Sequence, residues 1–184
     1  MANRCYLYAC DSLPLLIKED EKEKEETSNK PERFQTGVSE WSYSIPLIYK
    51  ILLSPNPQAS YSSIWKHEEE IAIIGDFESG VSRLKEFLGR ITVPTAKPAI
   101  EEALHFLDQE ENQSDYLLLE PGEIYDLVDQ ELVKQHRRLL KQISNLHNAT
   151  ERALIEVNNG SESAYAELGF GNWQKYLYFD FCKD

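Results

Sequence analysis

An apolar run followed at once by an amphipathic pattern, residues 71–91 (IAIIGDFESGVSRLKEFLGRI), constrains the fold more than any other stretch. Residues 70–74 predict a short buried strand, and the residues after Asp76 predict an amphipathic helix. Four apolar residues of this helix recur at helical spacing and are expected to point inward: Val81, Leu84, Phe87 and Leu88. We expect the strand and the helix to pack together.

The glycines of the same stretch raise the question of a phosphate site. Gly75 and Gly80 are spaced as at the start of a phosphate-binding loop, but the residues after Gly80 lack the lysine of that motif. Asp76 and Glu78 also place carboxylates at the expected helix N-terminus, where they stabilise the helix dipole and repel a phosphate. We therefore interpret the glycines as turn residues of a capped connection.

Three further short strands are predicted. They cover residues 3–9, the run DYLLLE that ends at Pro121, and residues 173–181. The last segment alternates Leu177, Phe179 and Phe181 with Tyr176, Tyr178 and Asp180. This alternation suits a half-buried strand that pairs with the N-terminal one.

Helical patterns occupy most of the remaining chain. A short buried helix is expected after Ser44 as N-cap and before Pro55, and another over residues 99–111. From Glu123 to Asn158 the pattern predicts one long helix, or two helices with a break near residues 145–148. The apolar residues of this pattern are Ile124, Leu127, Leu132, Leu139, Ile143, Leu146, Ala153 and Val157.

These elements predict an α+β fold. We expect residues 1–184 to form a single globular domain, with a small, mostly antiparallel sheet of about four strands. Four or five helices pack with the sheet, including one long helix in the C-terminal half. Residues 18–33 form a mixed-charge run without a large apolar residue, which predicts a mobile loop or a short charged helix that frays.

Charge and cysteine content narrow the function classes. The formal net charge of -13 repels nucleic acid and anionic membranes, so we expect neither as a partner. No apolar stretch reaches the roughly 18 residues that span a bilayer, and no export signal is evident.

Cys5, Cys10 and Cys182 have no metal-ligand spacing, and Cys5 and Cys10 should face opposite sides of a strand. We expect a cytoplasmic protein.

No catalytic residue, metal site or cofactor is predicted. The histidines His67, His105, His136 and His147 stand in no zinc pattern, and no nucleophile motif is present. We expect His136 on the apolar stripe of its helix and His105 and His147 on helix surfaces. His67 should lie in a solvated loop.

An acidic segment is the more specific feature. Ile100 to Val133 contains no Lys or Arg but eleven acids: Glu101, Glu102, Asp108, Glu110, Glu111, Asp115, Glu120, Glu123, Asp126, Asp129 and Glu131. The segment is either a solvated face that keeps the protein soluble or a docking face for a basic protein. In the second interpretation, all of these acids except Asp115 are predicted partner-binding residues. The following Lys134, Arg137, Arg138 and Lys141 favour a solvated stripe over an RNA site.

Four segments resemble a family of small bacterial proteins of unassigned biochemical function. They are MANRCYLY at the start, SEWSYSIPLIYKILLS at 39–54, SSIW at 62–65 and the stretch 71–91. No catalytic residue carries over from that family. The chain is also similar, more loosely, to immunity proteins of contact-dependent growth inhibition, which are small, acidic and cytoplasmic and neutralise basic toxin domains, commonly nucleases.

Two functions follow as hypotheses. The first is a non-enzymatic immunity protein that neutralises a basic, nuclease-type toxin domain through the acidic segment. The alternative is a small-molecule-binding or regulatory domain, or an unrecognised enzyme, with a pocket walled by Trp41, Tyr43, Tyr61 and Trp65.

Overall fold

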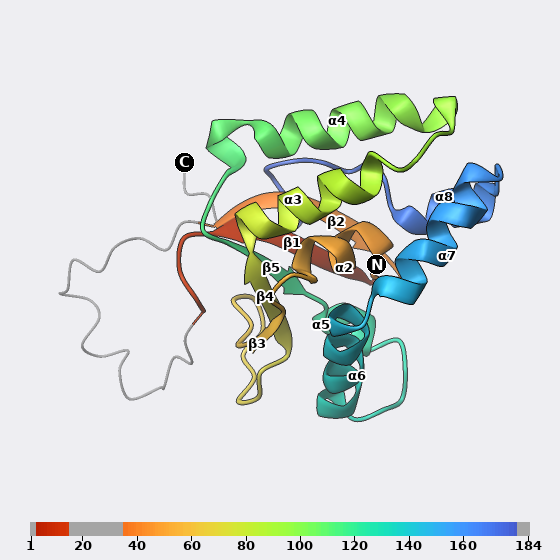
Figure 1. Ribbon diagram of the computed structural model, residues 1–184. Helices are drawn as coiled ribbons and strands as arrows, with labels where there is room; N and C mark the ends of the chain where they lie inside the picture. Colours follow the sequence, from red (N-terminus) through yellow and green to blue (C-terminus); the bar gives the residue numbers. More distant parts are fainter. Residues whose placement is uncertain (1–2, 15–34, 180–184) are drawn as a thin grey trace.

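The computed structural model describes residues 3–14 and 35–179 (Figure 1). The charged run 18–33 and the end of the predicted C-terminal strand lie outside the described residues. The described strands are β1 (Arg4–Cys10), β2 (Gln35–Ser42), β3 (Gln58–Ser60), β4 (Ala72–Asp76) and β5 (Tyr116–Glu120). They form one antiparallel sheet in the order β2-β1-β5-β4-β3.

Helices account for most of the other described residues. They are α2 (Leu47–Leu53), α3 (Phe77–Leu88), α4 (Lys97–Asp108), α5 (Gly122–Tyr125), α6 (Leu132–Ser144), α7 (His147–Asn158) and α8 (Glu162–Leu168), with short 3-10 turns η2 (Pro94–Ala96) and η3 (Glu110–Asn112). The predicted α+β fold is confirmed, with one strand more than expected. None of the described helices combines the length and the apolarity that crossing a membrane requires.

The sheet is buried on both faces. Cys5, Leu7 and Ala9 of β1 join the larger core, which α2 and α3 cover, whereas Tyr6, Tyr8 and Cys10 join a smaller core on the second face (Figure 1). The two cysteines therefore face opposite sides, as predicted. Burial raises the pKa of both thiols, that of Cys10 to about 12, so neither is a reactive thiolate.

Among the described residues, no helix contributes to the smaller core on the second face. Ile64, which lies between β3 and β4, packs on the second core, and so do Leu177 and Phe179 near the C-terminus. Two stretches without regular secondary structure therefore cover this face of the sheet.

The strand and helix of residues 71–91 form as predicted. They are β4 and α3, and all four residues expected to point inward are buried. The Asp76 carboxylate accepts a hydrogen bond of 2.7 Å from the backbone N–H of Ser79, which lowers the pKa of Asp76 and caps the helix.

The prediction that Gly75 and Gly80 are turn residues was wrong. Gly75 lies inside β4 against Leu53, and Gly80 lies in α3 against Leu52. A Cβ added to Gly80 would collide with the carbonyl oxygen of Leu52. Both glycines therefore allow α2 to approach β4 and α3 closely, and neither forms a turn.

Residues 132–158 form two helices, α6 and α7, in place of one long helix. α6 ends at Ser144 and α7 begins at His147, so the break falls at the predicted position. Residues 126–131 are not helical. The N-cap of α2 is Pro46 and not Ser44, and no side chain caps that helix.

The C-terminal segment is not the predicted strand. Among the described residues, Trp173 forms one isolated bridge to Ser39 of β2, and the Gly37 N–H donates to the Lys175 carbonyl at 2.9 Å. The segment therefore follows β2, a strand that the sequence did not predict, and not β1. Leu177 is nevertheless buried, as the alternation predicted.

Candidate functional site

The fold divides the acidic segment into two groups at opposite sides of the molecule. Figure 1 shows α4 along one side and α5 and α6 at the other, with β5 between them. The first group consists of Glu101, Glu102 and Asp108 on α4 and Glu110 and Glu111 in η3. Three of these acids form ion pairs, Glu101 with Lys97, Asp108 with Lys85 at 2.7 Å, and Glu111 with Lys175 at 3.1 Å.

Glu120, at the end of β5, is fully buried. Its carboxylate accepts hydrogen bonds from the Ser62 hydroxyl (2.7 Å) and from the backbone N–H and hydroxyl of Ser63 (2.6 and 2.9 Å). Burial raises the pKa of Glu120 to about 7, against the opposing effect of these hydrogen bonds. Glu120 therefore contributes nothing to an acidic surface, contrary to its predicted role.

Glu123 on α5 also acts within the fold. Its carboxylate accepts hydrogen bonds from the Arg4 N–H (2.7 Å) and the Tyr6 hydroxyl (3.2 Å), and its carbonyl accepts one from the Asn3 side chain (2.7 Å). These bonds fix α5 against the beginning of β1. The half-buried Glu123 serves as an anchor of α5.

The second acidic group lies between α5 and α6, in what we term the α5–α6 loop, Asp126–Glu131. All of its residues are exposed, and two of them are aliphatic: Leu127 at 46% and Val128 at 49%. Glu131 pairs with Lys134 at 2.9 Å, whereas Asp126 and Asp129 form no ion pair with any residue that the structure describes. The loop thus presents two aliphatic side chains between two unpaired carboxylates.

The α5–α6 loop is held in shape by one side chain of α6. The amide nitrogen of Gln135 donates to the backbone carbonyls of Tyr125 (3.0 Å) and Gln130 (2.9 Å). Within the loop, the Gln130 N–H donates to the Val128 carbonyl at 2.8 Å. A partner that binds this loop therefore meets an ordered backbone, and less conformational entropy is lost on binding.

Beneath the loop, a buried pair joins α5 to α6. The Tyr125 hydroxyl lies 3.3 Å from Nδ1 of His136, and burial lowers the pKa of His136. His136 is buried, as predicted, while His67, His105 and His147 are exposed. The described residues contain no group of three or more His, Cys, Asp or Glu that could hold a metal ion.

The four aromatic residues proposed as a pocket wall differ in exposure and in their contacts. Tyr43 is 64% exposed and has a left-handed backbone (φ 66), whereas Trp41 is half-buried against the larger core. Trp65 packs edge-on against Phe179, with ring centroids 5.2 Å apart. Among the described residues, no ring contact joins any two of Trp41, Tyr43, Tyr61 and Trp65.

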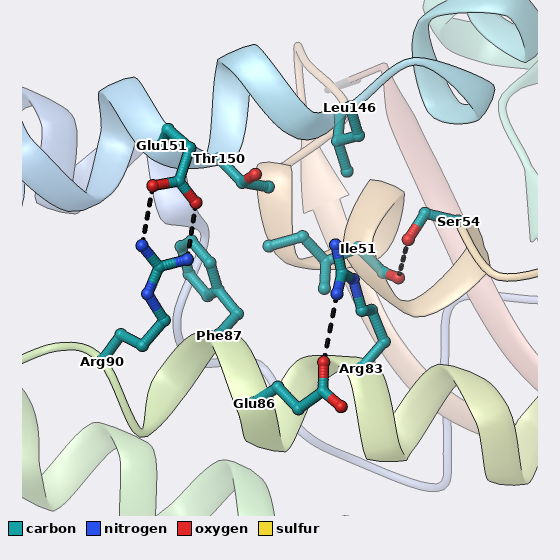
Figure 2. Close-up of a pocket in the computed structure, with 9 residues that line it drawn as sticks. All are labelled: Ile51, Ser54, Arg83, Glu86, Phe87, Arg90, Leu146, Thr150 and Glu151. Carbon is teal, nitrogen blue, oxygen red and sulfur yellow. Dashed lines mark hydrogen bonds and ion pairs between the residues drawn. The ribbon is translucent and has the colours of Figure 1, made fainter.

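A small cavity lies elsewhere, between α2, α3 and α7. Figure 2 shows that Arg90 reaches across to Glu151 and that Arg83 pairs with Glu86, at 2.5 and 3.0 Å. The cavity volume is about 80 Å³, well below the roughly 300–1000 Å³ of typical ligand sites. Its two arginines are already paired, so it does not offer a free cationic site.

Comparison with known proteins identifies a family. Residues 23–160 match a family described as a domain of unknown function (DUF7822). The chain belongs to this family. The DUF7822 match extends from before β2 to the end of α7 and so includes the α5–α6 loop. No curated protein and no solved structure matches the chain.

The residues that distinguish the α5–α6 loop were missed in the sequence. Leu127 was assigned to the inward stripe of a long helix, and Val128 and Gln135 were given no role. The local pattern gave no warning, because Ile124, Leu127 and Val128 are spaced i, i+3 and i+4, as on one face of a helix. The structure nevertheless has no helix at residues 126–131.

Proposed function

We propose that this DUF7822 protein is a non-enzymatic binding protein that takes a basic protein partner on the α5–α6 loop. One observation carries the proposal: Leu127 and Val128 are exposed between Asp126 and Asp129. No Lys, Arg or His within the described part of the chain forms an ion pair with either carboxylate. Of the other acids of the segment, Glu120 is buried, Glu123 anchors α5, and Glu101, Asp108, Glu111 and Glu131 pair with lysines. Glu102, Glu110 and Asp115 are also exposed, but the exposed large apolar side chains of residues 100–133 are Leu127 and Val128.

This arrangement has the chemistry of a protein interface. Aliphatic side chains at the centre lose contact with water on binding, and charged groups at the rim select the partner and accelerate encounter. A net charge of -13 attracts a basic protein from a distance, and the effect weakens as salt screens it. The hydrogen bonds of Gln135 keep the loop ready for contact.

The narrower form of the proposal is a cytoplasmic immunity protein whose partner is a basic toxin domain. The acidity of the chain and its similarity in profile to such immunity proteins support this form. In this form, the α5–α6 loop covers a cationic surface of the toxin that otherwise binds its substrate.

The coarse proposal can be tested by site-specific photo-crosslinking in cells. A photoreactive amino acid replaces Val128, and a control chain carries it at Ile155, an aliphatic residue of α7 that is 63% exposed. We expect one discrete, basic protein to crosslink at position 128 and not at 155. Equal capture at both positions, capture of an acidic protein, or no discrete product at 128 would contradict the proposal.

The immunity form has its own test. The neighbouring gene product is expressed with the wild-type chain, with Asp126→Lys/Asp129→Lys, or with Glu102→Lys/Glu110→Lys, which makes the same charge change on the other acidic group. We expect growth with the wild type and with the control, and growth arrest with the loop variant. If the neighbouring product is harmless on its own, or if both variants protect equally, the immunity form is wrong.

A further inference from the structure

Hydrogen bonds to one buried carboxyl group join the connection between β3 and β4 to the sheet. We term residues 61–70 the strap. Its first part meets the buried Glu120 through Ser62 and Ser63, whereas all residues from 66 to 70 are exposed and have no regular secondary structure. The polar part of this attachment therefore converges on the Glu120 carboxyl group, beside the apolar packing of Ile64 and Trp65.

The hydrogen bonds fix the direction of the contact with Ser62. The Ser62 oxygen accepts hydrogen bonds from the N–H groups of Ile64 (3.1 Å) and Trp65 (2.8 Å), which occupies both of its lone pairs. Its own proton must then point at Glu120. The Ser63 hydroxyl has no such constraint, so it can donate to an ionised Glu120 or accept from a protonated one.

No cation from residues 3–14 or 35–179 forms an ion pair that compensates a charge on Glu120. Tyr6 of β1 stands opposite Glu120 in the sheet, and Cys10 lies further along the same strand. Glu123 and Tyr125 come from α5, the buried His136 of α6 has a lowered pKa, and the adjoining strand β4 offers only apolar residues at this end. Among the described residues, no Lys, Arg or His forms an ion pair with Glu120, and on the strap Lys66 and His67 are exposed.

An ionised Glu120 is therefore costly when the strap is closed. Three hydrogen bonds replace water at the carboxylate, but burial without a countercharge disfavours the anion. The result is a pKa of about 7 in place of the ordinary 4.5, so the group titrates around neutral pH.

We propose that Glu120 is a proton-operated latch that holds the strap closed over the second face of the sheet when protonated and loosens it when ionised. Proton linkage gives the direction of the pH effect on the strap. Glu120 binds a proton more tightly when the strap is closed than when it is open, so low pH favours closing. This advantage is lost as pH rises from 4.5 through about 7. Over that range the closed-to-open ratio falls by up to about 300-fold.

Opening has a defined structural consequence. Trp65 on the strap packs against Phe179, which packs against Tyr6 with ring centroids 5.3 Å apart. Release of the strap removes Trp65 from this group and brings water to Glu120. The latch stands independently of the α5–α6 loop and its partner.

Hydrogen exchange and carbon NMR on the full chain test the latch. Protection factors are measured between pH 5 and 8 for the amides of Ser63 and Trp65, with Gly89 at the end of α3 as a control, since its N–H bonds to Lys85 far from the strap. The ¹³C resonance of the Glu120 carboxyl is followed over the same range. We expect a carboxyl midpoint near 7, with protection at Ser63 and Trp65 falling about tenfold per pH unit below that midpoint and constant protection at Gly89.

Two variants separate the latch from general destabilisation. Glu120→Gln does not titrate, so its strap protection should be independent of pH. Because an amide NH2 replaces one of the two oxygens that accept from Ser62 and from the Ser63 N–H, this protection should be lower than that of the wild type at pH 5. Ser63→Ala removes one donor to the anion and should raise the carboxyl midpoint. A midpoint that stays near 4.5, strap protection in the wild type that does not change with pH, or parallel loss of protection at Gly89 would overturn the proposal.

Discussion

The end of β5 and the α5–α6 loop are neighbours in sequence and both acidic, yet they place their carboxylates in opposite environments. Glu120 is fully buried, bonded to Ser62 and Ser63, and its pKa is raised to about 7. Asp126 and Asp129 are exposed and have no ion pair among the described residues. Acidic composition alone therefore gives no measure of acidic surface, because the Glu120 carboxyl group lies inside the fold and those of Asp126 and Asp129 face solvent.

The difference between the two regions arises from strand alternation and helix termination. Tyr116, Leu118 and Glu120 point to the same face of the sheet, and Glu120 is buried because that face is covered. After Pro121 the chain makes only a single turn of helix, anchored by Glu123, and then emerges into solvent.

The largest expected effect is a difference in the free energy of unfolding between a variant at the end of β5 and a variant in the α5–α6 loop. Glu120→Ala leaves three donors without an acceptor and opens a cavity, so it should lower the free energy of unfolding by about 3–5 kcal/mol. Asp126→Ala should change it by less than about 0.5 kcal/mol. Chemical denaturation measures the free energy of unfolding of both variants. A similar loss of stability in Glu120→Ala and Asp126→Ala would contradict the different roles of the two regions.

The pH dependence of stability should also differ between a change at Glu120 and a change at Asp126. Because the pKa of Glu120 rises from 4.5 to about 7 on folding, the wild type should lose up to about 3 kcal/mol relative to Glu120→Gln as pH increases through that range. Asp126→Asn should show the wild-type pH profile. Unfolding curves from pH 4 to 8 test this, and a wild type that gains stability relative to Glu120→Gln as pH rises would contradict it.

Much of the fold could be predicted because hydrophobic period is a local property. The stretch 71–91 carries both a strand and a helical pattern, and the cysteines of β1 fell on opposite faces as alternation requires. β2 was missed because its sequence, QTGVSEWS, holds few apolar residues, and its pairing with β1 brings it into the sheet. The segment after Trp173 alternates like a strand but pairs with β2 only at its start, a tertiary outcome that the local pattern does not contain.

The candidate site could be predicted only in part. The absence of Lys and Arg from residues 100–133 pointed to the segment that contains the α5–α6 loop, but it could not separate buried Glu120 from exposed Asp126. The YLLLE run offered a clue, since a strand buried on both faces tends to bury its last residue too. The role of Gln135 depends on three-dimensional contact with the Tyr125 and Gln130 carbonyls, which no sequence spacing reveals.

A smaller effect is expected at Gln135, the α6 side chain that holds the α5–α6 loop in shape. Gln135→Ala removes the donor to the Tyr125 and Gln130 carbonyls and should cost about 1 kcal/mol of stability. It should also raise exchange rates of the loop amides and weaken partner binding by an increased entropy cost. Gln142→Ala, at an exposed position of the same helix, is the control. If both variants leave loop exchange unchanged, the loop does not depend on Gln135.

The most direct test of the central claim is the affinity of the partner captured at Val128, measured at several salt concentrations for three chains. They are the wild type, Asp126→Asn/Asp129→Asn in the α5–α6 loop, and Glu102→Gln/Glu110→Gln in the other acidic group. All three should be equally stable to within about 0.5 kcal/mol. We predict that the loop variant binds about tenfold more weakly at low salt and loses most of the salt dependence, while the control matches the wild type. Equal affinities for the wild type and the loop variant, or an equal loss in the control, would contradict the assignment of the binding site to the α5–α6 loop.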